Sequence, residues 1–306
     1  MDTFAVIGKE TTDMASPTQL KTRQAGAYAS ILSAAFLWGI IGIWNRRLMA
    51  VGLSPSSIVV IRNIGGMLLL SAIFLVKDRS MFQVKKEHLK YFFGTGVISV
   101  VLFTVCYFSC QKICSLAVAS ILLYTAPSFV VILAAILWKE PVTKRKVMAL
   151  ALTLIGCALV CGIFAGELTV TIPGILLGLG AGFFYALYSV FGRYALEHYS
   201  ALKCTVWMFI FAGIASIVLI RPAELALLLN PVEGVTALIL VVFSTVTPFL
   251  LYTTGLAKVE AGKASIIASF EPVVAALTGV LVFGEPMGVT MGLGILCILA
   301  GVYILR

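Results

Sequence analysis

One carboxylate, Glu271, lies well inside an apolar stretch of the chain that runs from Ala264 to Pro286 and ends on a second, Glu285. At a rise of about 1.5 Å per residue from the charged flank 258–263, a helix would place it on the order of 12 Å below the surface of a hydrocarbon layer ~30 Å thick. An acid at the centre of a membrane helix costs roughly 2.5–3.5 kcal/mol. Glu271 therefore needs a partner, a water-filled cavity or a proton.

A proline follows this acid directly. Pro272 has no N–H and crowds the carbonyl group four residues before it, so the helix is expected to kink beside Glu271. Pro127 and Pro248 are expected to kink two other apolar stretches. Two interpretations of Glu271 stay open. The carboxylate binds a cationic or zwitterionic solute or takes up a proton, or it accepts hydrogen bonds from backbone N–H groups left open near Pro272 or Pro248.

Aromatic and small polar side chains are spaced to share helix faces. Trp38 and Asn45 lie two turns apart on one face of an apolar stretch, and Tyr185 and Tyr188 lie one turn apart on another. Such rings offer their faces to cations or aromatic solutes, whereas the alternative is that they pack helices together or form an interfacial belt. The predicted solute-binding set is Glu271, Trp38, Asn45, Tyr107, Tyr124, Tyr185, Tyr188 and Tyr252.

The other residue types that carry chemistry form no reactive group. The seven cysteines have no paired CxxC spacing and are expected to be small buried apolar residues. His88 and His198 lie apart from any grouping of an acid with a nucleophile. We therefore predict no catalytic residue, no metal and no cofactor, and the chain is not expected to be an enzyme.

Composition sets the class of the protein. Of the 306 residues, 61% are apolar and 11% are charged, and the mean hydropathy is +1.09; an ordinary soluble domain carries about 25% charged residues. Helices of about 20 residues cross a bilayer. We predict an all-α integral membrane protein with ten such helices, at about 28–49, 56–76, 91–111, 116–138, 146–165, 172–192, 203–221, 235–256, 263–283 and 287–305.

Residues 1–27 are polar and are expected to form a cytoplasmic tail before an uncleaved first helix. With the tail in the cytoplasm, most of the 22 Lys and Arg residues fall in cytoplasmic loops, which predicts that both termini are cytoplasmic. The same rule accounts for the net charge of +9, so nucleic acid is not an expected partner.

The sequence also repeats itself. A shift of 145 residues aligns Tyr107–Cys161 with Tyr252–Arg306 without a gap, and it matches Pro127 with Pro272. Beginnings of the halves align at a shift of 147, which brings Arg46 against Arg193. We predict two five-helix units, 28–165 and 172–305. Because five is odd, the second unit starts on the opposite side of the membrane and is inverted, which is the architecture of alternating-access transporters.

Two Glu-Pro pairs recur in the repeat, Glu140-Pro141 and Glu285-Pro286. Proline suits the first turn of a helix and a carboxylate is favoured near a helix N-terminus. Both glutamates are therefore predicted to cap the helix that follows them.

These features resemble the EamA-type carriers of the drug/metabolite transporter superfamily. The resemblance rests on the ten spans in two repeats, on the Ala-Ser-Ile and Pro of the fourth and ninth helices, on the Glu-Pro that ends each of them, on Glu271-Pro272 and on Arg62 in the second helix. It covers about residues 28–305. What it implies is a central cavity bordered by helices 1, 3, 4, 6, 8 and 9. Arg62, whose counterpart is Phe209, is expected to snorkel or to bond helix-end carbonyls, and the alternative is that it binds a substrate carboxylate.

The predicted function is a multi-pass carrier in a bacterial-type inner membrane that exports amino acids or related small metabolites by alternating access. One alternative is an exporter of amphipathic cationic drugs. Another, from a different class, is a membrane sensor or scaffold that transports nothing. The predicted partners are a small organic solute and the lipid bilayer. Gly288 and Gly292, one turn apart, also allow a homodimer through the last helix.

Overall fold

The computed structural model describes residues 17–164 and 169–305, with side chains from residue 24 onward. Within these residues every regular element is a helix. The predicted tail, 1–27, lies mostly outside the described residues, and the first described helix begins earlier than predicted, at Pro17.

The first half of the chain forms five helical segments. Four of the five are either interrupted by a turn or adjoin a short piece of 3-10 or π-helix. In chain order the helices are α2 (Pro17–Gly39), α3 (Ile41–Ala50), α4 (Pro55–Lys77), α5 (Leu89–Phe93), η3 (Gly94–Val101), α6 (Leu102–Gln111), α7 (Leu116–Leu123), α8 (Ala126–Trp138) and α9 (Lys144–Val160).

The second half repeats this order. Its helices are α10 (Ile172–Leu196), α11 (Ala201–Ser216), α12 (Pro222–Leu225), α13 (Pro231–Val241), η6 (Val242–Val246), α14 (Thr247–Leu256), α15 (Ala261–Ala268), α16 (Glu271–Phe283) and α17 (Val289–Ile304). Both η3 and η6 are π-helical, and they fall at equivalent places in the repeat.

Eight helical segments in the described residues are long and apolar enough to cross a membrane. They match eight of the ten predicted spans. The other two, α9 and α17, are helices of 17 and 16 residues. Large apolar side chains such as Leu176, Leu281 and Leu296 are exposed on the outside of the bundle. Because a soluble protein rarely exposes so much apolar surface, this outer face fits a lipid environment.

Polar residues next to proline set where several helices begin. Ser54 accepts a hydrogen bond from the backbone N–H of Ser57 at the start of α4, which carries Pro55 in its first turn. Thr171 does the same for α10 through the N–H of Gly174. The first N–H groups of a helix have no partner within the helix, and leaving them without a hydrogen bond in an apolar medium is costly. Side-chain caps supply that hydrogen bond.

The helix is interrupted before two of the three prolines predicted to cause kinks. Two turn residues separate α7 from α8 just before Pro127, and two separate α15 from α16 just before Pro272. At Pro248 the π-helical η6 gives way to α14. A proline in the first turn of a helix needs no hydrogen-bond partner for its nitrogen, so a new helix can begin there.

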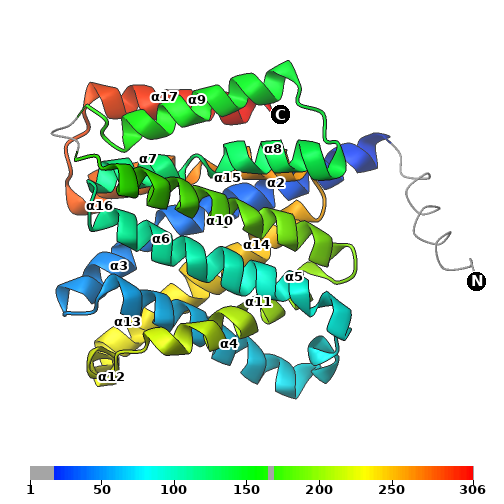
Figure 1. Ribbon diagram of the computed structural model, residues 1–306, viewed down its shortest axis with the longest axis vertical. Helices are drawn as coiled ribbons and strands as arrows, with labels where there is room; N and C mark the ends of the chain where they lie inside the picture. The colour runs from blue at the N-terminus through cyan, green and yellow to red at the C-terminus, as the bar shows by residue number, and fades with distance from the viewer. Residues whose placement is uncertain (1–16, 165–168, 306) are drawn as a thin grey trace, which may run out of the picture.

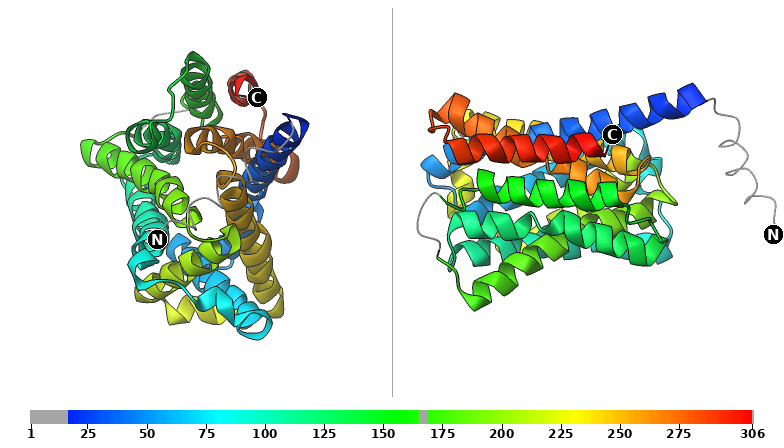
Figure 2. Two further views of the ribbon diagram at one scale, coloured as in Figure 1. Left: turned by 90° about the vertical axis from the view of Figure 1, so that its right-hand side faces the viewer. Right: turned by 90° about the horizontal axis from the view of Figure 1, so that it is seen from above.

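The helices run side by side, with α9 and α17 along one edge of the bundle and α4, α11 and α13 along the opposite edge (Figure 1). Helices of the two halves interleave: α14 packs on α2, α11 on α4, and α10 on α6, α7 and α8. Seen end-on, the helices surround a central region, and α9 and α17 form a pair outside it (Figure 2).

Glycine allows α9 and α17 to approach closely. A Cβ atom at Gly156 would lie 2.7 Å from the carbonyl oxygen of Gly294, and one at Gly301 would lie 2.8 Å from that of Ala149. By contrast, Gly288 and Gly292 meet only side chains of their own segment within 4 Å among the described residues. The close contacts of α17 are thus made by Gly294 and Gly301, and not by Gly288 and Gly292, which were predicted from their spacing.

Candidate functional site

A small cavity lies at the middle of the bundle, where α2, α10, α14 and the α7–α8 and α15–α16 breaks converge. Its volume is about 30 Å³, enough for one or two water molecules. Six of the eight predicted solute-binding residues line it: Trp38, Tyr124, Tyr185, Tyr188, Tyr252 and Glu271.

Glu271 is the first residue of α16 and faces this cavity. The position suits a carboxylate because the N-terminus of a helix favours negative charge. Helix α2 packs closely here, since a Cβ atom at Gly39 would lie 2.9 Å from the carbonyl oxygen of Glu271. Among the described residues no donor hydrogen-bonds to the Glu271 carboxylate. The interpretation in which backbone N–H groups near Pro272 or Pro248 bind it therefore finds no support here.

Arg62 on α4 is opposite in charge to Glu271, but the two form no ion pair among the described residues. Its Nε donates a hydrogen bond to Thr245 Oγ1 at 3.1 Å, and the Thr245 hydroxyl donates to the carbonyl of Leu240 at 3.0 Å. The prediction that Arg62 snorkels or bonds helix-end carbonyls is therefore wrong. A signal was present in the sequence: both Arg62 and Glu271 lack a charged counterpart in the other half, where Phe209 and Ala126 stand.

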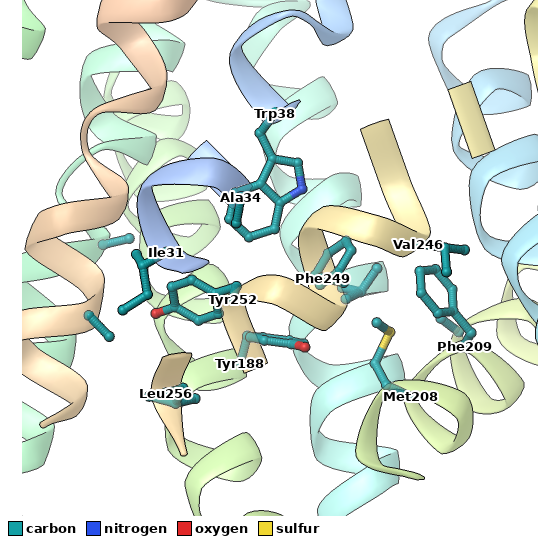
Figure 3. Packing of buried hydrophobic residues seen from close by; sticks show 14 of the residues in the cluster. Ile31, Ala34, Trp38, Tyr188, Met208, Phe209, Val246, Phe249, Tyr252 and Leu256 are labelled. Atoms are coloured by element: carbon teal, nitrogen blue, oxygen red, sulfur yellow. The ribbon is translucent and has the colours of Figure 1, made fainter. Parts of the chain in front are cut away.

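Four of the aromatic side chains that line the cavity, Trp38, Tyr188, Phe249 and Tyr252, lie close together (Figure 3). The ring of Trp38 contacts Phe249 edge-on at 5.3 Å between centroids and Tyr252 at 5.6 Å. Tyr188 lies 5.2 Å from Phe249 and 6.0 Å from Tyr252. Offset and edge-on contacts of this kind are favourable and rigid. These rings both pack the core and face the cavity, so the two interpretations of them are not exclusive.

Two tyrosine hydroxyls among these side chains are held by the protein itself. The Tyr188 hydroxyl lies 2.7 Å from Thr253 Oγ1, and the Tyr252 hydroxyl lies 2.8 Å from Ser189 Oγ. Because these hydroxyls already have partners, Tyr188 and Tyr252 offer their ring faces more than their oxygens to a solute.

Two predicted residues lie elsewhere. Tyr107 packs between α6 and α7, where its hydroxyl lies 3.1 Å from Ser120 Oγ. Asn45 is on α3, towards one end of the bundle, and its Oδ1 atom is buried without a partner among the described residues. Neither lines the cavity.

Sequence reasoning missed four aromatic or polar residues that line the cavity: Phe249, Ser189, Ser265 and Ser269. Ser265 belongs to the repeated Ala-Ser-Ile segment, so its place beside a predicted kink was a usable signal. Ser189 lies four residues after Tyr185, and Phe249 lies three residues before Tyr252, spacings that would have placed each on the same helix face as its tyrosine.

Glu140 does cap a helix, but not the one that follows it. Its carboxylate accepts hydrogen bonds from the N–H groups of Ala261 at 3.0 Å and Gly262 at 3.4 Å, at the start of α15 in the other half. The following helix, α9, is capped by Thr143 instead. The Glu140 carboxylate thus lies between the start of α15 and Lys146 of α9, with which it forms an ion pair.

Glu285 caps no helix. The residue at the N-cap of α17 is Gly288, which offers no side chain, and the Glu285 carboxylate forms an ion pair with Arg46 on α3. The prediction of a cap is therefore wrong for Glu285. Its Oε2 atom also occupies the space beside Gly279 of α16, so the side chain is folded back towards the helix before it.

Comparison with known proteins identifies the family. The model of the EamA-like transporter family matches residues 25–162 and again residues 172–306. The chain belongs to the EamA-like transporter family. Among its relatives, an uncharacterized transporter of Archaeoglobus fulgidus is 35% identical over 189 residues, which are 61% of this chain and 66% of the relative. Uncharacterized transporter YwfM of Bacillus subtilis is 25% identical over 282 residues, 90% of this chain and 92% of the relative.

The fold is also known from experiment. A solved crystal structure superposes with a TM-score of 0.76 at 18% identity, covering 92% of this chain and 96% of the other. An identity this low shows the fold alone. As an EamA-like protein, the chain is a multi-pass membrane transporter, and the names of its relatives point away from enzymatic activity.

Proposed function

We propose that this EamA-like transporter exports an amino acid or a related small metabolite by alternating access, with Glu271 binding the solute or coupling its movement to a proton. The observation that carries the proposal is that the Glu271 carboxylate faces a cavity built from both halves of the chain and has no hydrogen-bond donor among the described residues. An ammonium group or a proton would supply what is missing.

The cavity has to change size during such a cycle. At about 30 Å³ it has no room for an amino acid. Its wall draws on α2 from the first half and α10 and α14 from the second. A rocking of the halves that separates these helices at one end would enlarge the cavity and connect it to one side of the membrane.

The proposal includes ten crossings, inverted halves and cytoplasmic termini. Three observations support it: the family model matches the chain twice, both halves contain a π-helical segment and a proline break at equivalent positions, and α2 begins at the end of the bundle where α17 finishes (Figure 1). Basic residues in short loops favour the cytoplasm for that end. An inner-membrane location accords with the name of a relative, uncharacterized inner membrane transporter YicL of Salmonella typhimurium, 24% identical over 287 residues.

An exporter of amphipathic cations is the second candidate, and the aromatic lining beside Glu271 is the observation that favours it. Ring faces attract cations, most strongly where water is excluded. An amino acid adds a carboxylate to the ammonium group, and Arg62 is the charge that would receive it. The two candidates therefore differ in what they require of Arg62.

Flux into liposomes tests the proposal. We expect Glu271→Gln to lower the rate of solute exchange severalfold and to remove its dependence on pH, because the variant can neither carry a charge nor release a proton. Glu87→Gln serves as the control, since Glu87 is an exposed acid at a loop, 67% accessible. An unchanged rate and pH profile in Glu271→Gln would remove this residue from the mechanism.

The substrate class is tested by thermal stabilisation. A solute that binds the folded protein raises its apparent stability by about 2.7 kcal/mol at 100 times its dissociation constant. Amino acids and quaternary amines can be compared on the parent and on Arg62→Gln. Stabilisation by amino acids that is lost in Arg62→Gln favours the first candidate; stabilisation by amines in both proteins favours the second. If none of these solutes stabilises the parent, the proposed substrate classes are wrong.

A further inference from the structure

We propose that two repeat-related clusters, each built on an arginine from one half and a glutamate from the other, are the opposing locks of the transport cycle. The inference rests on the proposed alternating access. One cluster is Arg193 with Glu140 and Trp138; the other is Arg46 with Glu285 and Phe283.

The first lock joins α10 to the end of α8. Arg193 Nη1 donates to Glu140 Oε1 at 3.1 Å, and the guanidinium lies 5.3 Å from the ring centroid of Trp138. Glu140 also accepts the two N–H bonds from the start of α15 and lies 3.5 Å from Lys146 Nζ. One carboxylate thus holds three helices together at this end of the bundle.

The second lock joins α3 to the end of α16. Arg46 pairs with Glu285 through its guanidinium, which also lies 4.1 Å from the ring centroid of Phe283. Here the arginine belongs to the first half and the acid to the second, the reverse of the first lock. The ends of α3 and α16 lie at one end of the bundle and the end of α8 at the other (Figure 1).

The two locks correspond residue by residue in the repeat. The shift of 147 that aligns the beginnings of the halves relates Arg46 to Arg193, and the shift of 145 relates Glu140 to Glu285 and Trp138 to Phe283. An ion pair needed only for the stability of one half would be made within that half. Both of these cross between halves instead, one at each mouth, and a rocking motion that opens a mouth has to break the pair there.

The locks differ in burial. The side chains of Arg46 and Glu285 are 53% and 39% accessible, whereas Glu140 is 7% accessible. Water and salt screen an exposed pair, and removing one member of a buried group leaves the others without a partner. Neutralising Glu140 should therefore shift the balance between the two mouths more than neutralising Glu285. A second ion pair between the halves, Arg47 with Glu233 at 3.0 Å, lies at the same end as Glu285. Tyr194 and His88 occupy the repeat-related positions, so this pair has no equivalent at the other end.

Amide hydrogen exchange of the full chain in nanodiscs tests the inference without any substrate. Glu285→Gln is expected to speed exchange at its own end, read at the amides of Gly284 and Glu285. It should also slow exchange at the other end, read at Ala261 and Gly262, on the order of 5-fold for a typical coupling between two sites. Glu140→Gln should speed exchange around its own end and slow it at Gly284 and Glu285. Glu87→Gln should change neither end.

The reciprocal response separates locks from ordinary ion pairs. If each variant loosens its own end and leaves the other unchanged, the pairs are structural and the inference is wrong, although the proposed transport function would stand. The double variant Arg46→Glu with Glu285→Arg restores the attraction with exchanged charges and should return both ends to the parental exchange rates. Failure of this rescue, with the variant folded by circular dichroism, would equally contradict the inference.

Discussion

Arg62 on α4 and Glu271 at the start of α16 carry opposite charges within the bundle, and neither has a charged counterpart in the other half of the chain. Phe209 and Ala126 occupy the repeat-related positions, and both are buried. The arginine–glutamate clusters at the two ends are related by the repeat, whereas these two charges are not. Of the two, Glu271 lines the cavity.

The first prediction concerns the coupling of these two charges. Arg62→Gln and Glu271→Gln should each destabilise the protein, because each leaves a charge in the core without its partner. The double variant should cost less than the sum of the two by about 1–3 kcal/mol, the usual range for residues in one electrostatic network. Thermal unfolding of the four proteins in one detergent measures the difference. Strict additivity would mean that the two charges do not interact.

The second prediction separates the ring of Tyr252 from its hydroxyl. Tyr252→Phe removes the bond to Ser189 and should lower stability by about 1 kcal/mol, with solute flux largely retained, because the ring still contacts Trp38. Tyr252→Ala should remove most of the flux, since the wall of the cavity is lost. Tyr107→Ala is the matched control outside the cavity. Equal loss of flux in Tyr107→Ala and Tyr252→Ala would argue against this cavity as the path.

Much of the fold could be predicted from sequence because hydropathy and repeat are local patterns. Helix breaks at Pro127 and Pro272 follow from proline chemistry, Trp38, Tyr185 and Tyr188 follow from helical spacing, and Glu271 follows from its place in an apolar stretch. Tyr107 was misplaced for a specific reason. Its counterpart Tyr252 bonds Ser189, but the residue related to Ser189 is Gly42, which has no side chain, so the Tyr107 hydroxyl bonds Ser120 instead. The difference between Gly42 and Ser189 thus goes with different hydroxyl partners for the two repeat-related tyrosines.

The partners of Glu140 and Glu285 could not be predicted for a different reason. A Glu-Pro pair indicates a helix start nearby but not which helix the carboxylate reaches. Glu140 is 121 residues from the N–H of Ala261, and Glu285 is 239 residues from Arg46. Such contacts depend on how the two halves interleave, which no local spacing specifies.

The third prediction concerns stability at acid pH. Glu224, between two spans, accepts hydrogen bonds from the hydroxyl of Ser54 at 2.6 Å and from its N–H at 2.7 Å. These bonds lower the pKa of Glu224 from 4.5 to about 2. A lowered pKa in the folded state means that the stabilisation is present above pH 4.5 and is lost as the pH falls towards 2. Glu224→Gln should therefore melt lower than the parent at pH 6, and the gap should close with acidification.

Melting temperatures of the parent and Glu224→Gln between pH 6 and pH 3 measure this gap. Glu87→Gln is the control, because the Glu87 side chain is exposed and its contacts among the described residues are ion pairs with Lys85 and His88 rather than hydrogen bonds of this kind. A gap that stays constant with pH would show that the Glu224 carboxylate gains nothing from Ser54.

The fourth prediction concerns the glycines of the two helices at the edge of the bundle. Gly156→Ala should destabilise the protein by about 1–3 kcal/mol, because the new Cβ atom would lie 2.6 Å from Ile298 Cγ1 and 2.7 Å from a backbone oxygen of α17 that cannot turn away. Gly292→Ala is the matched control on α17. Its Cβ would meet nothing nearer than Met287 Cε at 3.9 Å, and alanine favours a helix over glycine by about 1 kcal/mol, so this variant should be neutral or slightly stabilising. Thermal unfolding at low protein concentration tests both. If Gly292→Ala proves as destabilising as Gly156→Ala, then the Gly288 and Gly292 face is covered after all, and a dependence of the melting temperature on protein concentration would identify a second copy of the chain as what covers it.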